Sequence, residues 1–220
     1  LLEEDFVRLN VRYIAIMDNI DTANGVSDIV PMQDLFNEWH AKNTSDKVRR
    51  VMQSRGNAGI PLTTNTPFGY KKDPKDKNRW LVDEPAAEVV QRIFQMCVSG
   101  LGPTQIAKRL KANGVMTPSE YLHSVGVKCP ANPPAFPHNW CSATVADILD
   151  RQEYTGDTVN FRSFRQSFKL KKRLDKPQEE WKIFPDTHPA IIDRETFVLV
   201  QNLRQHRRRP TRTGIVSMFS

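Results

Sequence analysis

Basic side chains are concentrated in three stretches of the sequence. Residues 36–59, 101–116 and 162–176 each hold more bases than acids, and the third has seven bases against one acid. Ammonium and guanidinium groups bind phosphate oxygens through charge-assisted hydrogen bonds, so these stretches offer polyanion binding. The candidate binding residues, with one glutamine among them, are Lys47, Arg49, Arg50, Arg55, Gln105, Lys108, Arg109, Lys111, Arg162, Arg165, Lys169, Lys171, Lys172 and Arg173.

The charge of the whole chain is uneven. The formal net charge is +7, and residues 1–38 hold eight acids and two bases, which leaves +13 on the remainder. A basic field of that size favours nucleic acid as a partner, although a solvated basic surface also fits the charge alone.

Other site chemistries have weaker support in the sequence. Cys97, Cys129 and Cys141 form no CxxC pair, which fits the reduced thiols of a cytoplasmic protein. Cys129, His138 and Cys141 offer only three ligands in a proline-rich loop, too few for a structural zinc site. No metal or cofactor is therefore expected, and no apolar run is long enough to span a bilayer.

One long helix should carry the first basic stretch. The sequence predicts a helix over 31–56, about 39 Å long, which exceeds a small domain, so its second half should project. Its apolar side chains follow helical spacing and need another subunit or another element to cover them. These expected oligomerisation residues are Met32, Leu35, Phe36, Trp39, Val48, Val51 and Met52.

The segments on either side of this helix differ in kind. Residues 1–10 have helical spacing and residues 11–17 predict a buried strand, like the last βα portion of an incomplete α/β domain. Residues 56–70 combine three glycines, two prolines and three threonines, which predicts a linker and a domain boundary.

The second basic stretch belongs to a predicted helix-turn-helix. A strand over 80–83 precedes a helix opened by Asp83 and ended by Gly100, and a short helix before Gly114 follows. Further along, the pattern predicts an irregular loop over 117–139, a helix over 142–150 capped by Ser142, strands over 153–161 and 179–184, and a helix capped by Asp193.

Taken in order, these features resemble the large serine recombinases, particularly those of conjugative and mobilisable transposons. "VRYIAIMDNIDT" (11–22) resembles the final strand of their catalytic domain, and "FNEWHAKNTSDKVRRVMQSRGNAG" (36–59) resembles their dimerisation helix. "WLVDEPAAEVVQRIFQMCVSGLGPTQIAKRLKANGV" (80–115) and "HPAIIDRETFVLVQ" (188–201) resemble their recombinase domain.

The resemblance implies an α+β fold with four parts. These are the end of a catalytic domain with its long helix (1–58), a linker (59–70), a recombinase DNA-binding domain (71–209) and a lead-in to a further domain (210–220). The family's nucleophilic serine and its zinc ribbon are expected outside these 220 residues. Ser45 and Ser54 are therefore read as helix surface, and the chain alone is expected not to cut DNA.

The resemblance also implies partners and a mechanism. Such enzymes bind attachment sites in double-stranded DNA as dimers, synapse as tetramers, and exchange strands through 5′-phosphoserine links without a high-energy cofactor. The basic end of the long helix is expected at the minor groove and the helix at 104–113 in or beside the major groove. Membranes are not expected as partners, and the location implied is the nucleoid of a bacterial cytoplasm.

Two alternatives compete with this reading. A non-enzymatic helix-turn-helix regulator would explain the basic helix but not residues 1–30, for which a regulator has no need. A metal-dependent nuclease using Asp18 and Asp21 would explain two carboxylates after a strand, but capping of the loop is the simpler role for them.

Overall fold

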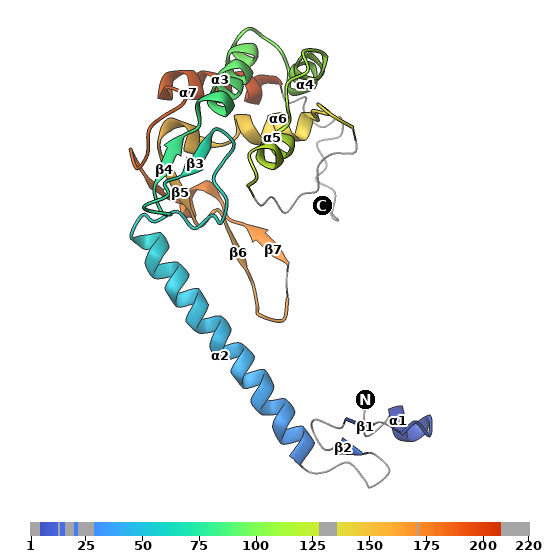
Figure 1. Ribbon diagram of the computed structural model, residues 1–220. Coiled ribbons are helices and arrows are strands. Elements are labelled where there is room, and N and C mark those ends of the chain that lie inside the picture. Colours follow the sequence, from blue (N-terminus) through green and yellow to red (C-terminus); the bar gives the residue numbers. More distant parts are fainter. Residues whose placement is uncertain are drawn as a thin grey trace. The chain divides into compact units, whose positions relative to one another are not determined.

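The computed structural model describes residues 5–12, 14–15, 20–21, 29–127, 136–170 and 172–207 (Figure 1). The chain forms two compact units. Unit 1 comprises the residues up to Ser54 together with Phe164–Leu174, and unit 2 comprises Arg55–Ser163 together with the residues from Asp175 onward. Helices and short antiparallel strand pairs make up both units, as expected for an α+β fold.

The described part of unit 1 consists mainly of a long helix, a short helix and two strand pairs. α1 (Asp5–Arg8) precedes β1 (Ile14–Ala15), which pairs antiparallel with β2 (Ile20–Asp21). The guanidinium of Arg12 holds both carboxylate oxygens of Asp21 at 2.9 and 2.6 Å. The prediction of a buried strand over 11–17 is wrong for the residues whose burial the structure describes, since Val11 is 49% and Ile14 54% exposed.

α2 (Ile29–Asn57) has 29 residues and is therefore about 43 Å long. Its seven predicted oligomerisation residues are all exposed, by 44% to 69%. At 100° per residue, the group from Met32 to Trp39 lies about 160° around the helix from the group of Val48, Val51 and Met52. These side chains therefore form two apolar patches on opposite faces of α2 rather than one stripe.

Unit 2 consists of helices and two-stranded antiparallel sheets (Figure 1). β3 (Tyr70–Lys72) and β4 (Trp80–Val82) form a hairpin that leads into α3 (Glu84–Val98) and α4 (Pro103–Ala112). α5 (Pro118–Ser124) and α6 (Ser142–Leu149) follow, then the 3-10 helix η2 (Gln152–Thr155).

The remaining elements complete unit 2 and add a hairpin. β5 (Thr158–Asn160) pairs antiparallel with β8 (Lys182–Phe184), which follows the 3-10 helix η3 (Gln178–Glu180). α7 (Arg194–Arg207) comes last, and β6 (Ser163–Arg165) pairs with β7 (Arg173–Asp175).

The core of unit 2 lies between its helices and the β3–β4 hairpin. Tyr154 is fully buried, stacks on Tyr70 and meets Phe94 edge-on, and its hydroxyl donates to the carbonyl of Phe68 at 2.8 Å. α3 contributes Val90, Ile93 and Cys97, and α4 and α6 contribute Ile106, Leu110, Val145 and Leu149. Each large apolar side chain buried this way stabilises the fold by about 1.5–3 kcal/mol.

Several local predictions are confirmed. The strand expected over 80–83 is β4, and the helix expected between Asp83 and Gly100 and the short helix expected before Gly114 are α3 and α4. Asp193 caps α7, since its carboxylate accepts from the amide of Thr196 at 2.8 Å. Val200 of this helix lies in the core and Phe197 packs against it.

Others are wrong in detail. The loop expected over 117–139 contains α5, which begins with a capping box in which Thr117 and Glu120 hold each other's backbone amides. α6 is capped by Cys141 and not by Ser142, and hydrogen bonds from Thr144 lower the pKa of the Cys141 thiol. The strands expected over 153–161 and 179–184 are each shortened by a 3-10 helix at their start.

Residues 59–70, expected as a linker, are attached to unit 2. The side-chain amide of Asn160 donates to the carbonyls of Gly56 and Ile60, and its oxygen accepts from the amide of Leu62. A side chain at Gly56 would overlap the ring of Phe161, so the glycine permits this close packing. The segment 58–69, called the arm below, is therefore held on β5.

Candidate nucleic-acid interface

α4 presents a basic face because its opposite face is fully used by the core. Gly102 caps the helix and Pro103 occupies its first turn. Ile106, Ala107 and Leu110 are at most 4% exposed, which leaves the other side of the helix to solvent. The basic side chains lie in the last two turns, where the negative end of the helix dipole favours them.

The α4 side chains that the sequence predicted as a site have different surroundings. Lys108 and Arg109 are exposed and Lys111 donates to the side-chain oxygen of Asn139 at 2.9 Å. Gln105 is partly engaged, since its side-chain oxygen accepts from the amide of Gly102 at 3.0 Å. The NH2 group of Gln105 makes no hydrogen bond among the described residues and is available to a ligand.

α4 packs on α6 and on α3, with a four-residue turn between α3 and α4 (Figure 1). Gly100 in that turn has φ +98°, a conformation that glycine adopts without strain. Two helices joined by such a turn, the second carrying exposed bases, are typical of helix-turn-helix DNA binders.

The basic residues of α2 are exposed. Lys47 and Arg50 have no acidic partner among the described residues, and Arg49 lies 3.9 Å from Asp46 one turn earlier. A weak exposed pair of this kind leaves Arg49 available to another anion. Arg55, which belongs to unit 2, donates to the side-chain oxygen of Asn78 at 3.0 Å.

The third basic stretch divides into one structural arginine and an exposed hairpin. Arg162 pairs with the buried carboxylate of Glu153 at 3.3 Å and lies over the ring of Trp181 at 4.7 Å, so it stabilises unit 2. Lys169 pairs with Glu38 at 2.5 Å. Arg165, Lys172 and Arg173 are exposed on β6, β7 and the turn between them, and Lys171 lies outside the described residues.

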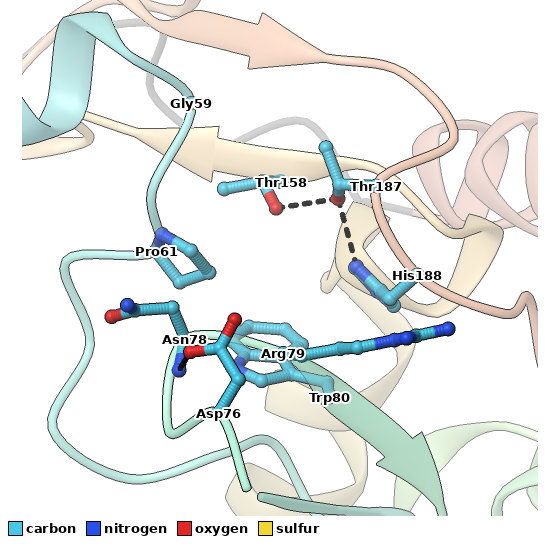
Figure 2. A pocket seen from close by; sticks show the side chains of 9 residues that line it. All are labelled: Gly59, Pro61, Asp76, Asn78, Arg79, Trp80, Thr158, Thr187 and His188. Atoms are coloured by element: carbon cyan, nitrogen blue, oxygen red, sulfur yellow. Dashed lines mark hydrogen bonds between the residues drawn. The ribbon is translucent and has the colours of Figure 1, made fainter. Parts of the chain in front are cut away.

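Sequence reasoning missed the basic turn between β3 and β4. No binding residue was predicted within residues 73–79, although the sequence holds Lys75, Lys77 and Arg79 there and the structure shows all three exposed. A hollow of about 350 Å³ lies beside this turn (Figure 2). It is lined by Gly59, Pro61, Asp76, Asn78, Arg79, Trp80, Thr158, Thr187 and His188.

A hydrogen-bonded chain forms one wall of this hollow (Figure 2). Thr158 and Thr187 share a hydrogen bond of 2.6 Å, and Thr187 contacts Nδ1 of His188 at 3.0 Å. Nε2 of His188 lies 2.7 Å from the carbonyl of Glu153, so that nitrogen must carry the proton. Burial lowers the pKa of His188, which keeps the ring neutral at neutral pH.

The alternative metal sites receive no support from the described residues. Cys129 and Asp18 lie outside the part of the chain that the structure describes. Within it, no three His, Cys, Asp or Glu side chains cluster as metal ligands. Among the same residues, no helix combines the length and apolar character that crossing a bilayer requires.

Comparison with protein families decides the assignment. The family model described as Recombinase matches residues 84–207, which is more than half of the chain and runs from the start of α3 to the end of α7. The chain belongs to the recombinase family. The family predicted from the sequence is thus confirmed, and α3, α4, α6 and α7 are elements of its recombinase domain.

Two solved structures are similar to this recombinase chain at low identity. One, described as a crystal structure of an LSR–DNA complex, is 18% identical with a TM-score of 0.43, over 73% of this chain and 38% of that one. The other, from work on sequence requirements of the Listeria innocua prophage attP site, is 20% identical with a TM-score of 0.43, over 71% and 51%. The chain thus spans about half or less of each, and no curated protein matches it significantly.

Proposed function

We propose that this chain is the DNA-binding portion of a site-specific serine recombinase and that it binds attachment-site DNA. The observation that carries the proposal is α4. Its apolar face is buried, and Lys108 and Arg109 are exposed on this second helix of the α3–α4 pair in a chain of the recombinase family. The test is binding of a DNA duplex measured over a range of salt concentrations.

The proposal assigns each basic element a part of the DNA. α4 lies in or beside the major groove, where Lys108 and Arg109 contact phosphates or base edges. Arg49 and Arg50 of α2 contact phosphates near the minor groove, and so do Arg165 and Lys172 of the β6–β7 hairpin. Gly59 and the small polar residues of the arm permit close approach of the backbone to the groove.

The same proposal explains the exposed apolar patches of α2. A regulator that binds DNA through α3 and α4 alone has no use for an exposed apolar helix, whereas a recombinase that assembles into dimers and tetramers requires one. The patch of Met32, Leu35, Phe36 and Trp39 is proposed to pack against a second copy of this chain and the patch around Val51 against a further surface of the assembly.

Adding charge to the first patch should abolish self-association. Leu35→Glu with Trp39→Glu places two carboxylates at positions that are now 69% and 60% exposed and apolar. We expect sedimentation velocity to show a concentration-dependent dimer for the native chain and a monomer for this variant, because a charge buried without a partner costs several kcal/mol.

The matched control is Gln33→Glu with Asn37→Glu. Gln33 and Asn37 are exposed on the same turns of α2 but on another face than Leu35 and Trp39. Their substitution adds the same two charges away from the first apolar patch. The control should associate like the native chain. A native chain that is monomeric at every concentration, or a control that dissociates equally, would contradict an interface at this patch.

A further inference from the structure

The turn between β3 and β4 is a fixed, positively charged projection that the proposed function does not use. Its backbone is closed by hydrogen bonds between Asp73 and Arg79 and between Arg79 and Asp76, all at 3.0 Å. The turn therefore has a defined shape, and its side chains start from fixed positions.

The two acids of the turn are occupied in holding that shape. The carboxylate of Asp73 accepts from the amide of Lys75 at 2.8 Å, and that of Asp76 accepts from the amide of Asn78 at 2.9 Å. Lys75, Lys77 and Arg79 in contrast make no side-chain hydrogen bond or ion pair anywhere in the part of the chain that the structure describes. Three exposed cations thus stand together without a partner.

The neighbours of the turn extend this positive surface. Arg55, at the end of α2, donates to Asn78, and Lys72 donates to the carbonyl of Thr64 in the arm at 2.5 Å. The turn is therefore continuous with the arm, to which the proposed function already assigns DNA contact, and with the last turn of α2. All of these residues belong to unit 2, as does α4.

The hollow beside the turn adds a concave polar surface to this projection (Figure 2). Arg79 and Asn78 lie on one side of it, Gly59 and Pro61 of the arm on another, and the hydroxyls of Thr158 and Thr187 on a third. About 350 Å³ is roughly ten times the liquid volume of one water molecule, which leaves room for a phosphodiester group with its shell of water.

We propose that the β3–β4 turn is a second DNA-binding element of this chain. Lys75 and Lys77 bind backbone phosphates of duplex DNA, and Arg79 holds one phosphodiester group at the mouth of the hollow. This inference rests on the proposed function, because it assigns further contacts to the same duplex that α4 binds. The carboxylate of Asp76 also lines the hollow, and its negative charge repels a phosphate bound there.

The test removes charge from the turn and follows salt-dependent binding of a 40-base-pair duplex of random sequence, with Lys75→Gln/Lys77→Gln and Arg79→Gln as variants. Each lost phosphate contact reduces the magnitude of the negative slope of log K against log salt by about 0.9. The double variant should therefore have a slope about 2 less steep than the native chain, and it should bind at least tenfold more weakly at 0.1 M salt. Arg79→Gln should flatten the slope by about 1, and Asp76→Asn should tighten binding by removing the opposing charge.

The control removes equal charge from cations that acids already neutralise. Lys176→Gln/Arg204→Gln does so, since Lys176 pairs with Glu180 and Arg204 with Asp150. Because the side chains of Lys75, Lys77 and Arg79 are exposed, the turn variants should unfold at the native temperature. The inference is overturned if the turn variants bind like this control while Lys108→Gln/Arg109→Gln weakens binding, and the proposed function survives that result. Loss of DNA binding by the native chain itself overturns both.

Discussion

The double variant Lys108→Gln/Arg109→Gln should bind duplex DNA about 60-fold more weakly than the native chain at 0.1 M salt. Each phosphate contact contributes a factor of about 8 at that concentration relative to 1 M salt, and the two side chains are exposed on α4 without an acidic partner among the described residues. If one of them reads a base edge, the loss on the preferred sequence includes about 1–3 kcal/mol of discrimination. Fluorescence anisotropy of a labelled duplex measures both.

Lys111 is left intact in this variant because it holds Asn139, and its removal would disturb the loop before α6. The charge-matched control Lys176→Gln/Arg204→Gln should bind like the native chain. Equal affinities of the native chain and the α4 variant at low salt would show that α4 does not touch DNA, whatever else in the chain does.

Replacing Asn160 with alanine should lower the free energy of unfolding by about 3 kcal/mol. The change removes three hydrogen bonds and leaves the carbonyl of Ile60 and the amide of Leu62 without a partner among the described residues, while the carbonyl of Gly56 still accepts from the amide of Gly59. Each unsatisfied group costs about 1–3 kcal/mol when it is buried. The arm is only half-buried, so water can form hydrogen bonds with these groups and reduce the cost. The melting temperature should fall by roughly 6–12 °C for a unit of this size.

Hydrogen exchange identifies the place of this loss. The amide of Leu62 should exchange faster in Asn160→Ala, because the arm loses its attachment to β5. Asn202→Ala, which truncates an exposed asparagine on α7, is the matched control and should leave both the melting temperature and the exchange of Leu62 unchanged. An unchanged melting temperature in Asn160→Ala would mean that the arm is held by other contacts.

The parts of the fold that follow from local spacing could be predicted from the sequence. The apolar residues of α3 and α4 recur at helical intervals and Asp193 precedes α7 by one residue, so periodicity and capping locate these helices. α5 could also have been predicted, because the capping box of Thr117 and Glu120 can be recognised from the sequence. The proline-rich residues after it led to the prediction of a loop instead.

Contacts between distant residues could not be predicted in the same way. Asn160 holds an arm that lies about 100 residues earlier in the chain, and no local pattern marks an asparagine for that role. Arg162 stands in a basic run like its neighbours, yet a buried Glu153 and the ring of Trp181 make it structural. The cap of α6 falls on Cys141 because its thiol, one residue before Ser142, reaches the amide of Thr144.

The sequence predicts which stretches are basic, but not where their side chains lie on the surface. The sequence gives Lys75, Lys77 and Arg79 next to Asp73 and Asp76, which reads as a nearly balanced turn. Only the hydrogen bonds show that both acids are used by the backbone while the cations are left unpaired. Whether the three cations are paired with the two acids or free to bind a phosphate therefore depends on the three-dimensional structure.

The central claim is that this chain binds DNA through its basic surfaces, and the salt dependence of binding tests it most directly. Anisotropy of a 40-base-pair duplex should be measured between 0.05 and 0.4 M salt at constant pH, with a neutral polymer as a control for crowding. The account predicts a straight line of log K against log salt, with a slope of about −5 or steeper if six or more phosphates are contacted. Undetectable binding at 0.05 M salt, or a slope near zero, would contradict it.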